Sequence, residues 1–158
     1  MVPHEHDAGR ETVPLPHLCG GHVSPPSTFP FSARIDELLR TAPAMRRVLP
    51  GLDDAGHRLA IQRIGVENFS PAENERMNKG VTSEEIDEAF ALLAELGRDH
   101  PESFAFEEYG GFGFITFTPW TTLDDLEINL SHARRLGVEE KSFFLRSRLQ
   151  LQPGRPIT

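Results

Sequence analysis

Five polar residues lie at the ends of two apolar runs, and their side chains could contact a ligand: Glu67, Asn68, Ser70, Thr116 and Thr118. A carboxylate such as Glu67 can accept hydrogen bonds from a hydroxyl or amine of a cofactor. For Glu67 a bond to nearby backbone or to Arg63 stays an equal alternative. Asn68 and Ser70 could share the ligand role, but Ser70 followed by Pro71 also fits the N-cap and first position of a helix, which we favour.

The two threonines belong to an aromatic run that ends at Pro119. With a strand period of two, Thr116 and Thr118 share a face with Phe112 and Phe114. If that face lines a cavity, the hydroxyls contact a ligand; otherwise they are ordinary β-branched strand residues.

Two arginines, Arg146 and Arg148, alternate with leucines in the last apolar run. Two guanidinium groups on one face of a strand cannot be buried without anions. One hypothesis is that they bind a carboxylate or phosphate of a substrate or cofactor. The other, equally weighted, is that they pair with internal acids such as Glu107 or Glu108.

The N-terminal segment carries a group of residue types that can bind metals: His4, His6, His17, Cys19 and His22. Their spacing matches no structural zinc pattern, and we therefore predict no metal site there. A single cysteine also excludes an internal disulfide. The sequence contains no Gly-x-Ser-x-Gly turn and no Walker loop.

The elements that must position these residues follow from periodicity and capping signals. Leu59–Val66 is apolar on both faces, as expected for a strand in a covered parallel sheet. Thr82 and Glu85 have the spacing of a capping box, which predicts a helix ending at Gly97. Two further strands are predicted, at residues 112–118 and 143–151.

Two more helices are predicted with less regular signals. Ser32 can cap a short helix that Ala42 and Pro43 end. Thr121 or Thr122 can cap another helix that Gly137 ends, with the following buried stripe: Leu123, Leu126, Leu130 and Ala133. The resulting order of strand, helix, strand, helix, strand requires parallel strands with right-handed crossovers, and ligands bind at the carboxyl ends of such strands.

Composition divides the chain in two and excludes some classes of function. Residues 1–31 hold six prolines and four histidines, which predicts a flexible lead-in before one domain at residues 32–158. The net charge of −8 disfavours binding to a nucleic-acid duplex. No apolar run approaches the ~18 residues of a membrane span, and the first residues lack a signal sequence. We therefore expect a cytoplasmic protein.

Three segments together resemble the radical S-adenosylmethionine enzymes. Ile64–Ser70, followed by Met77–Gly80 and the helix capped by Thr82, resembles that family's fourth strand and next helix. Residues 112–125 resemble its fifth strand and turn, and the Pro-Gly-Arg-Pro at residues 153–156 is similar to the ending after its sixth strand. The resemblance covers roughly residues 59–157 and keeps the order of the family.

The resemblance implies the later half of a TIM-like (β/α) barrel, with parallel strands whose ends line a pocket for S-adenosylmethionine and a small-molecule substrate. In the family, a radical derived from the cofactor abstracts a substrate hydrogen. Glu67, Asn68, Ser70, Thr116 and Thr118 would contact the cofactor, and Arg146 and Arg148 the substrate.

The chain departs from the family at the iron–sulfur cluster. A Cys-x3-Cys-x2-Cys loop holds the family's [4Fe-4S] cluster, whereas this chain has one cysteine. We therefore expect a truncated or degenerate member that is inactive alone. An open edge at Leu59–Val66 would allow a partner chain or self-association unless the lead-in covers it. The alternative is a small α/β binding or interaction module without catalytic activity.

Overall fold

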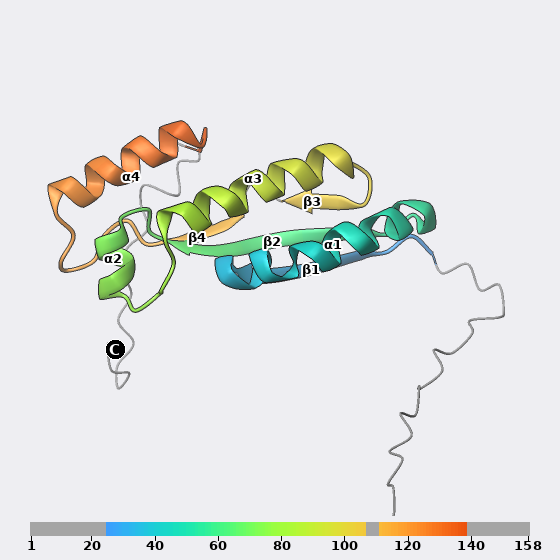
Figure 1. The fold of residues 1–158 in the computed structure, drawn as a ribbon, viewed down its shortest axis with the longest axis horizontal. Helices are drawn as coiled ribbons and strands as arrows, with labels where there is room; N and C mark the ends of the chain where they lie inside the picture. The colour runs from blue at the N-terminus through green and yellow to red at the C-terminus, as the bar shows by residue number, and fades with distance from the viewer. Residues whose placement is uncertain (1–24, 107–110, 139–158) are drawn as a thin grey trace, which may run out of the picture.

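The computed structural model describes residues 25–106 and 111–138. Within them the chain forms a parallel sheet and a layer of helices (Figure 1). The elements follow in this order: β1 (Thr28–Arg34), α1 (Ile35–Ala55), β2 (Arg58–Glu67), α2 (Pro71–Arg76), α3 (Ser83–Asp99), β3 (Phe104–Phe106), β4 (Phe112–Phe114) and α4 (Leu123–Arg135).

Strand β2 occupies the centre of the sheet. It pairs in parallel with β1 on one side and with both β3 and β4 on the other. β3 lies beside the first half of β2, from Leu59 to Ile61, and β4 lies beside its second half, from Ile64 to Glu67. The prediction that Leu59–Val66 forms an open edge is therefore wrong, because β1 and β4 cover its two sides.

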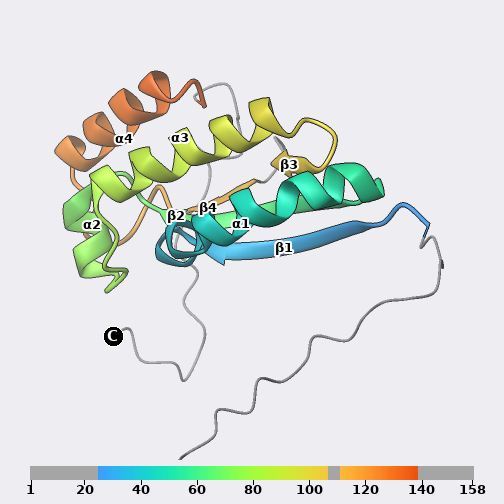
Figure 2. The ribbon, with the colours of Figure 1, turned by 45° about the vertical axis from the view of Figure 1, so that its right-hand side comes forward.

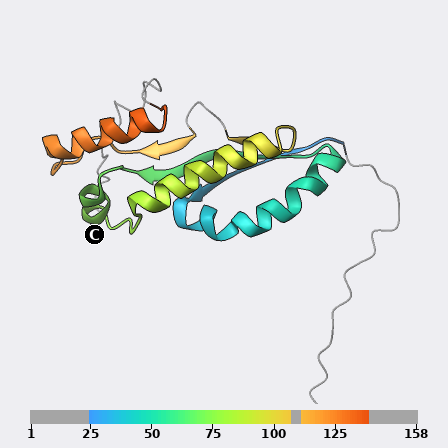
Figure 3. The ribbon, with the colours of Figure 1, turned by 45° about the horizontal axis from the view of Figure 1, so that its top comes forward.

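Helices α1 and α3 lie side by side against one face of this sheet (Figures 2 and 3). α4 lies beside α3, to which Arg135 is joined by a two-bond ion pair with Asp87 at 2.7 Å. The core forms between the helices and the sheet and contains mainly Ile, Leu and Phe side chains. The described residues therefore form a mixed α/β arrangement, with parallel strands and helices on one side of them. The sheet is open, and no closed barrel is present in the described residues.

The first helix is longer than predicted and begins differently. Its N-cap is Arg34 rather than Ser32, and it continues through Pro43 and Pro50 to Ala55. Proline weakens a helix but does not always end it. Here a buried stripe runs on both sides of Pro43 and holds the helix to the sheet: Ile35, Leu38, Ala42, Met45 and Leu49.

Strand β1 includes part of the segment predicted to be an irregular lead-in. Residues 28–31 pair with β2 in regular register, so this part of the prediction is wrong. β1 pairs with residues 58–65, far along the chain, and its one local signal is the short alternation of Phe29, Phe31 and Ala33 with polar residues and Pro30.

The capped elements agree well with expectation. The capping box of Thr82 and Glu85 begins α3, and the helix extends beyond Gly97 to Asp99. Thr122 caps α4, and Gly137 takes the left-handed conformation just after that helix, with φ of +66°. The strand predicted at residues 112–118 is shorter, because β4 ends at Phe114.

The predicted buried stripe of α4 is wrong for two of its leucines. Leu123 is 83% exposed and Leu130 is 38% exposed, whereas Ala133 is buried as predicted. Asp125 and Asn129 are buried instead. Each has polar partners near α2, and these partners fix the rotation of α4 about its axis.

The predicted strand at residues 143–151, with Arg146 and Arg148, lies outside the described residues, as do His4, His6, His17, Cys19 and His22. Among the helices that the structure describes, none has the length and apolar character needed to cross a bilayer.

Candidate functional site

Glu67 ends β2 in a backbone conformation that a glutamate rarely adopts. Its φ is +64°, and the pairing of β2 with β4 shifts register between Gly65 and Glu67. A bulge of this kind re-aims the side chain at the end of a strand. Strained backbone in such positions is frequent at functional sites, because ordinary strand geometry would not place the side chain there.

The Glu67 carboxylate lies between cationic groups from two other segments. Its Oε1 is 3.5 Å from Nζ of Lys79, which follows α2. With Arg34, Gly65 and Val81, these two residues line a small cavity of about 20 Å³. The pKa of Arg34 is raised mainly by its hydrogen bond and ion pair with Asp36, and the charge of Glu67 adds to this. The structure therefore gives Glu67 a partner other than Arg63.

The peptide that joins Asn68 to Phe69 is held from both sides by buried amides. Nδ2 of Asn74 donates to the carbonyl oxygen of Asn68 at 2.7 Å, and the amide nitrogen of Phe69 donates to Oδ1 of Asn129 at 3.0 Å. Helices α2 and α4 thus fix the backbone immediately after Glu67.

Asn68 and Ser70 are both fully buried and contact other parts of the protein. Nδ2 of Asn68 donates to the carbonyl oxygen of Ile115 at 2.8 Å, and its Oδ1 accepts from the amide of Ser70 at 2.8 Å. Ser70 caps α2, with Pro71 in its first turn, so the favoured interpretation of this pair is confirmed. Cofactor contacts by Asn68 and Ser70 stay predictions.

An ionic cluster lies next to Ser70 and consists of Glu73, Arg76 and Asp125. Nη1 of Arg76 contacts Oε1 of Glu73 at 2.6 Å and Oδ2 of Asp125 at 3.0 Å, and Oγ of Ser70 donates to Oδ1 of Asp125 at 2.5 Å. Burial raises the pKa of Asp125, but hydrogen bonds from Ser70, Thr122 and Arg76 together hold that pKa well below its usual range. This cluster joins α2 to the start of α4.

The threonines of the aromatic run follow β4, which ends at Phe114. Phe112 and Phe114 belong to the core, so the face they define is covered by helices. Thr116 is buried, and the hydroxyl of Thr118 donates to Oε2 of Glu73 at 2.8 Å. Ligand contacts by Thr116 and Thr118 stay predictions.

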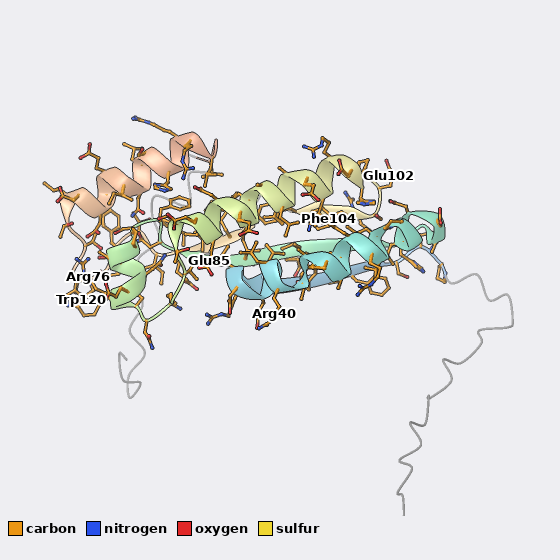
Figure 4. All side chains as sticks on the ribbon, in the orientation of Figure 1. Arg40, Arg76, Glu85, Glu102, Phe104 and Trp120 are labelled. Carbon is orange, nitrogen blue, oxygen red and sulfur yellow. The ribbon has the colours of Figure 1, made fainter. Side chains whose placement is uncertain are left out.

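Trp120 lies beside Arg76 at the exposed side of the ionic cluster. Its side chain is 43% exposed, and its carbonyl oxygen is 3.4 Å from Nη1 of Arg76 (Figure 4). A lone tryptophan at a turn between a strand and a helix is usually a packing residue. The exposed ring shows that packing accounts for only part of its surface.

Sequence reasoning did not find Arg34, Lys79, Glu73, Arg76 or Asn129. For Asp125, a further member of the ionic cluster, the sequence does hold a signal. Asp125 stands three residues after Thr122, as in a capping box, and both hydrogen bonds of that box are present. The others meet only through pairings between distant segments. In the described residues, three or more His, Cys, Asp or Glu side chains nowhere gather as metal ligands.

The donor set of this chain does not fit a four-iron cluster, because its sequence contains one cysteine and such clusters take four ligands, usually thiolates. Comparison with protein-family models, with curated proteins and with solved structures found no match to this chain.

Proposed function

We propose that this chain contributes the later strands of a radical S-adenosylmethionine barrel and that Glu67 contacts the bound cofactor. Three features support the proposal. The strands are parallel and consecutive, the helices lie on one side of them, and the motifs that resemble the family lie at the carboxyl ends of β2 and β4. In folds of this kind, ligands bind at that edge. S-Adenosylmethionine supplies the radical chemistry of the family when bound.

The observation that carries the proposal is the position of Glu67. Its neighbours Asn68 and Ser70 are fully buried, whereas the Glu67 side chain is 25% exposed at the sheet edge. Within the described part of the chain, Lys79 at 3.5 Å is its one direct ionic contact. The carboxylate therefore keeps room to accept hydrogen bonds from ribose hydroxyls or an ammonium group.

Calorimetric titration of the full chain with S-adenosylmethionine tests this assignment. We expect Glu67→Gln to weaken binding about tenfold or more, because the amide loses a charge-assisted hydrogen bond. The matched control is Glu102→Gln. Glu102 is exposed and lies at the opposite end of the sheet, just before β3 (Figure 4).

The control variant should bind within about twofold of the unchanged chain, since an exposed carboxylate far from the ligand contributes little. Absence of saturable binding at millimolar ligand would refute a cofactor site in this chain. Equal affinities of the Glu67 and Glu102 variants would refute the role of Glu67.

A second candidate function is a binding module without catalysis. One observation favours it: Ser70 and Thr118, two of the residues expected to contact the cofactor, use their side chains in hydrogen bonds within the protein. The two functions differ in turnover only when a second chain supplies the [4Fe-4S] cluster, because one cysteine cannot hold that cluster. With a partner chain that carries a Cys-x3-Cys-x2-Cys loop and with reductant present, a module would still release its ligand unchanged, whereas an enzyme fragment would give cleaved S-adenosylmethionine, which chromatography of the ligand measures directly.

A further inference from the structure

The face of the sheet opposite the helices is distinct in composition. Register places Ser32 opposite Arg63 and Arg34 opposite Gly65, and Gly65 in turn opposite Gly113. Residues directly opposite each other in a sheet point to the same side. The alternate rows carry Phe31, Ala33 and Ile64 into the helix-covered core. We call the side that carries Arg63 and Gly65 the helix-free face.

Two glycines lie side by side on the helix-free face. A Cβ at Gly113 would stand 3.9 Å from Cδ of Arg63, and a Cβ at Gly65 would stand 3.2 Å from Oε1 of Glu67. The stem of Arg63 and the carboxylate of Glu67 therefore border a floor of bare backbone. Glycine in a strand often marks a place where a ligand approaches closely.

The charges on this face are mostly positive and partly unpaired. Arg34 pairs with Asp36 at 2.9 Å, and Glu67 pairs with Lys79. Arg58 and Arg63 are exposed, and their guanidinium groups make neither an ion pair nor a hydrogen bond within the part of the chain that the structure describes. The chain has 24 acidic and 16 basic residues, so acidic partners are in excess. Two arginines on one strand without an acidic partner among the described residues are therefore unexpected.

We propose that the helix-free face binds a small molecule with an oxyanion group, with Arg63 as the anchor and the Gly65–Gly113 pair as the floor. A guanidinium group binds a carboxylate or phosphate through two parallel hydrogen bonds. The floor admits a flat or unbranched portion of the ligand next to the backbone. This inference rests on the proposed function in one respect: it takes the bound molecule to be the substrate of that function.

The test is calorimetric titration of the full chain with two probes, pyrophosphate and malonate, which separate a phosphate from a carboxylate ligand. Arg63→Met keeps the apolar stem and removes the charge, so we expect it to weaken binding about tenfold or more. The matched control is Arg40→Met. Arg40 is exposed on α1, away from the sheet (Figure 4), and should leave binding unchanged.

A third variant, Arg63→Lys, keeps the charge but loses the planar fork, so its affinity should fall between the other two. Thermal unfolding of each variant checks that the fold is retained. Equal affinities of the Arg63→Met and Arg40→Met chains, or no saturable binding of either probe at about 10 mM, would overturn the proposal.

Titration of the Arg63→Met chain with S-adenosylmethionine separates this inference from the proposed function. We expect its cofactor affinity to equal that of the unchanged chain, because Glu67 contacts the cofactor and Arg63 the oxyanion. If the unchanged chain binds a probe through Arg63 but does not bind S-adenosylmethionine, the proposed function fails and the oxyanion site stands.

Discussion

At the scale of single residues, the polar side chains that follow β2 have two different roles. Asn68 and Ser70 are buried and bonded to backbone or to Asp125, so they hold the turn in place. Glu67 alone among the three reaches the surface, at a backbone angle that costs energy in the free chain. The fixed turn therefore holds the one exposed carboxylate in a position where it can contact a ligand.

The ionic cluster of Glu73, Arg76 and Asp125 leads to a prediction about Asp125. Asp125→Asn removes the charge that Arg76 faces and leaves that guanidinium with one carboxylate, Glu73. Because Arg76 is about one third exposed, solvent weakens this pair, and we expect a loss of about 1–2 kcal/mol in the free energy of unfolding at pH 7, chiefly from the weakened hydrogen bonds to the carboxylate. Urea denaturation measures it.

The same variant should change the dependence of stability on pH. Because the pKa of Asp125 is lowered in the folded chain, its contribution is present above its ordinary value of about 4 and is lost as pH falls below that value. Stability of the unchanged chain should therefore fall more steeply below about pH 4 than that of the variant. Asp124→Asn, an exposed neighbour in the same turn, is the control. Equal slopes for the Asp125 and Asp124 variants would contradict this account.

Local residue patterns predicted local contacts well. The caps at Thr82 and Thr122 each involve a partner three residues away, and both are present. The contact of Glu67 with Lys79 depends on the path of the chain through α2, which no spacing rule specifies. Sequence therefore identified Glu67 as a candidate but not the cations around it.

At the scale of elements, α1 shows how packing outweighs local preference. Pro43 lies in the ninth position of a helix of 21 residues, where its ring removes one backbone hydrogen bond. The helix continues because its buried stripe packs on β1 and β2 over its whole length. The sequence rule that proline ends a helix failed here for that reason.

Replacement of this proline should stabilise the protein. Pro43 is exposed, so Pro43→Ala restores a helical amide without disturbing the core. We expect the free energy of unfolding to rise by about 1–2 kcal/mol, since the gain in helix propensity exceeds the greater freedom of the unfolded chain. Chemical denaturation measures the change.

The matched control for this variant is Pro71→Ala. Pro71 stands in the first turn of α2, where its nitrogen needs no partner within the helix. That substitution should give no gain in stability. A loss of stability in Pro43→Ala, or an equal gain in both variants, would show that the proline does not strain α1.

The helical period of α4 was also misleading. Its leucines recur at the spacing of a buried stripe, yet Leu123 and Leu130 are exposed while Asp125 and Asn129 face inward. Apolar periodicity assumes that the apolar face turns inward. In α4, two hydrogen bonds fix the rotation instead: Asp125 accepts one from the hydroxyl of Ser70, and Asn129 accepts one from the backbone amide of Phe69.

At the scale of the whole molecule, the sheet and helices of residues 25–106 and 111–138 form a one-sided arrangement. Helices cover one face of the sheet, and the other carries the arginines and the glycine pair. The alternation of strands and helices predicted the parallel sheet, because parallel neighbours need crossover helices. It did not predict β1, where Phe29, Phe31 and Ala33 alternate with Pro30 and Ser32, because the many prolines of residues 1–31 favoured an irregular segment. The central place of β2 followed from that missed strand.

The cysteine content leads to a prediction for the whole chain. Anaerobic incubation with iron and sulfide should give no stable absorbance near ~400 nm and no retained iron after desalting, because one thiolate cannot hold four irons. Cys19→Ser should behave like the unchanged chain, since Cys19 is the one thiol in the sequence. A retained cluster of about four irons that disappears in Cys19→Ser would mean that non-cysteine ligands complete the site, which overturns our view of what this chain lacks.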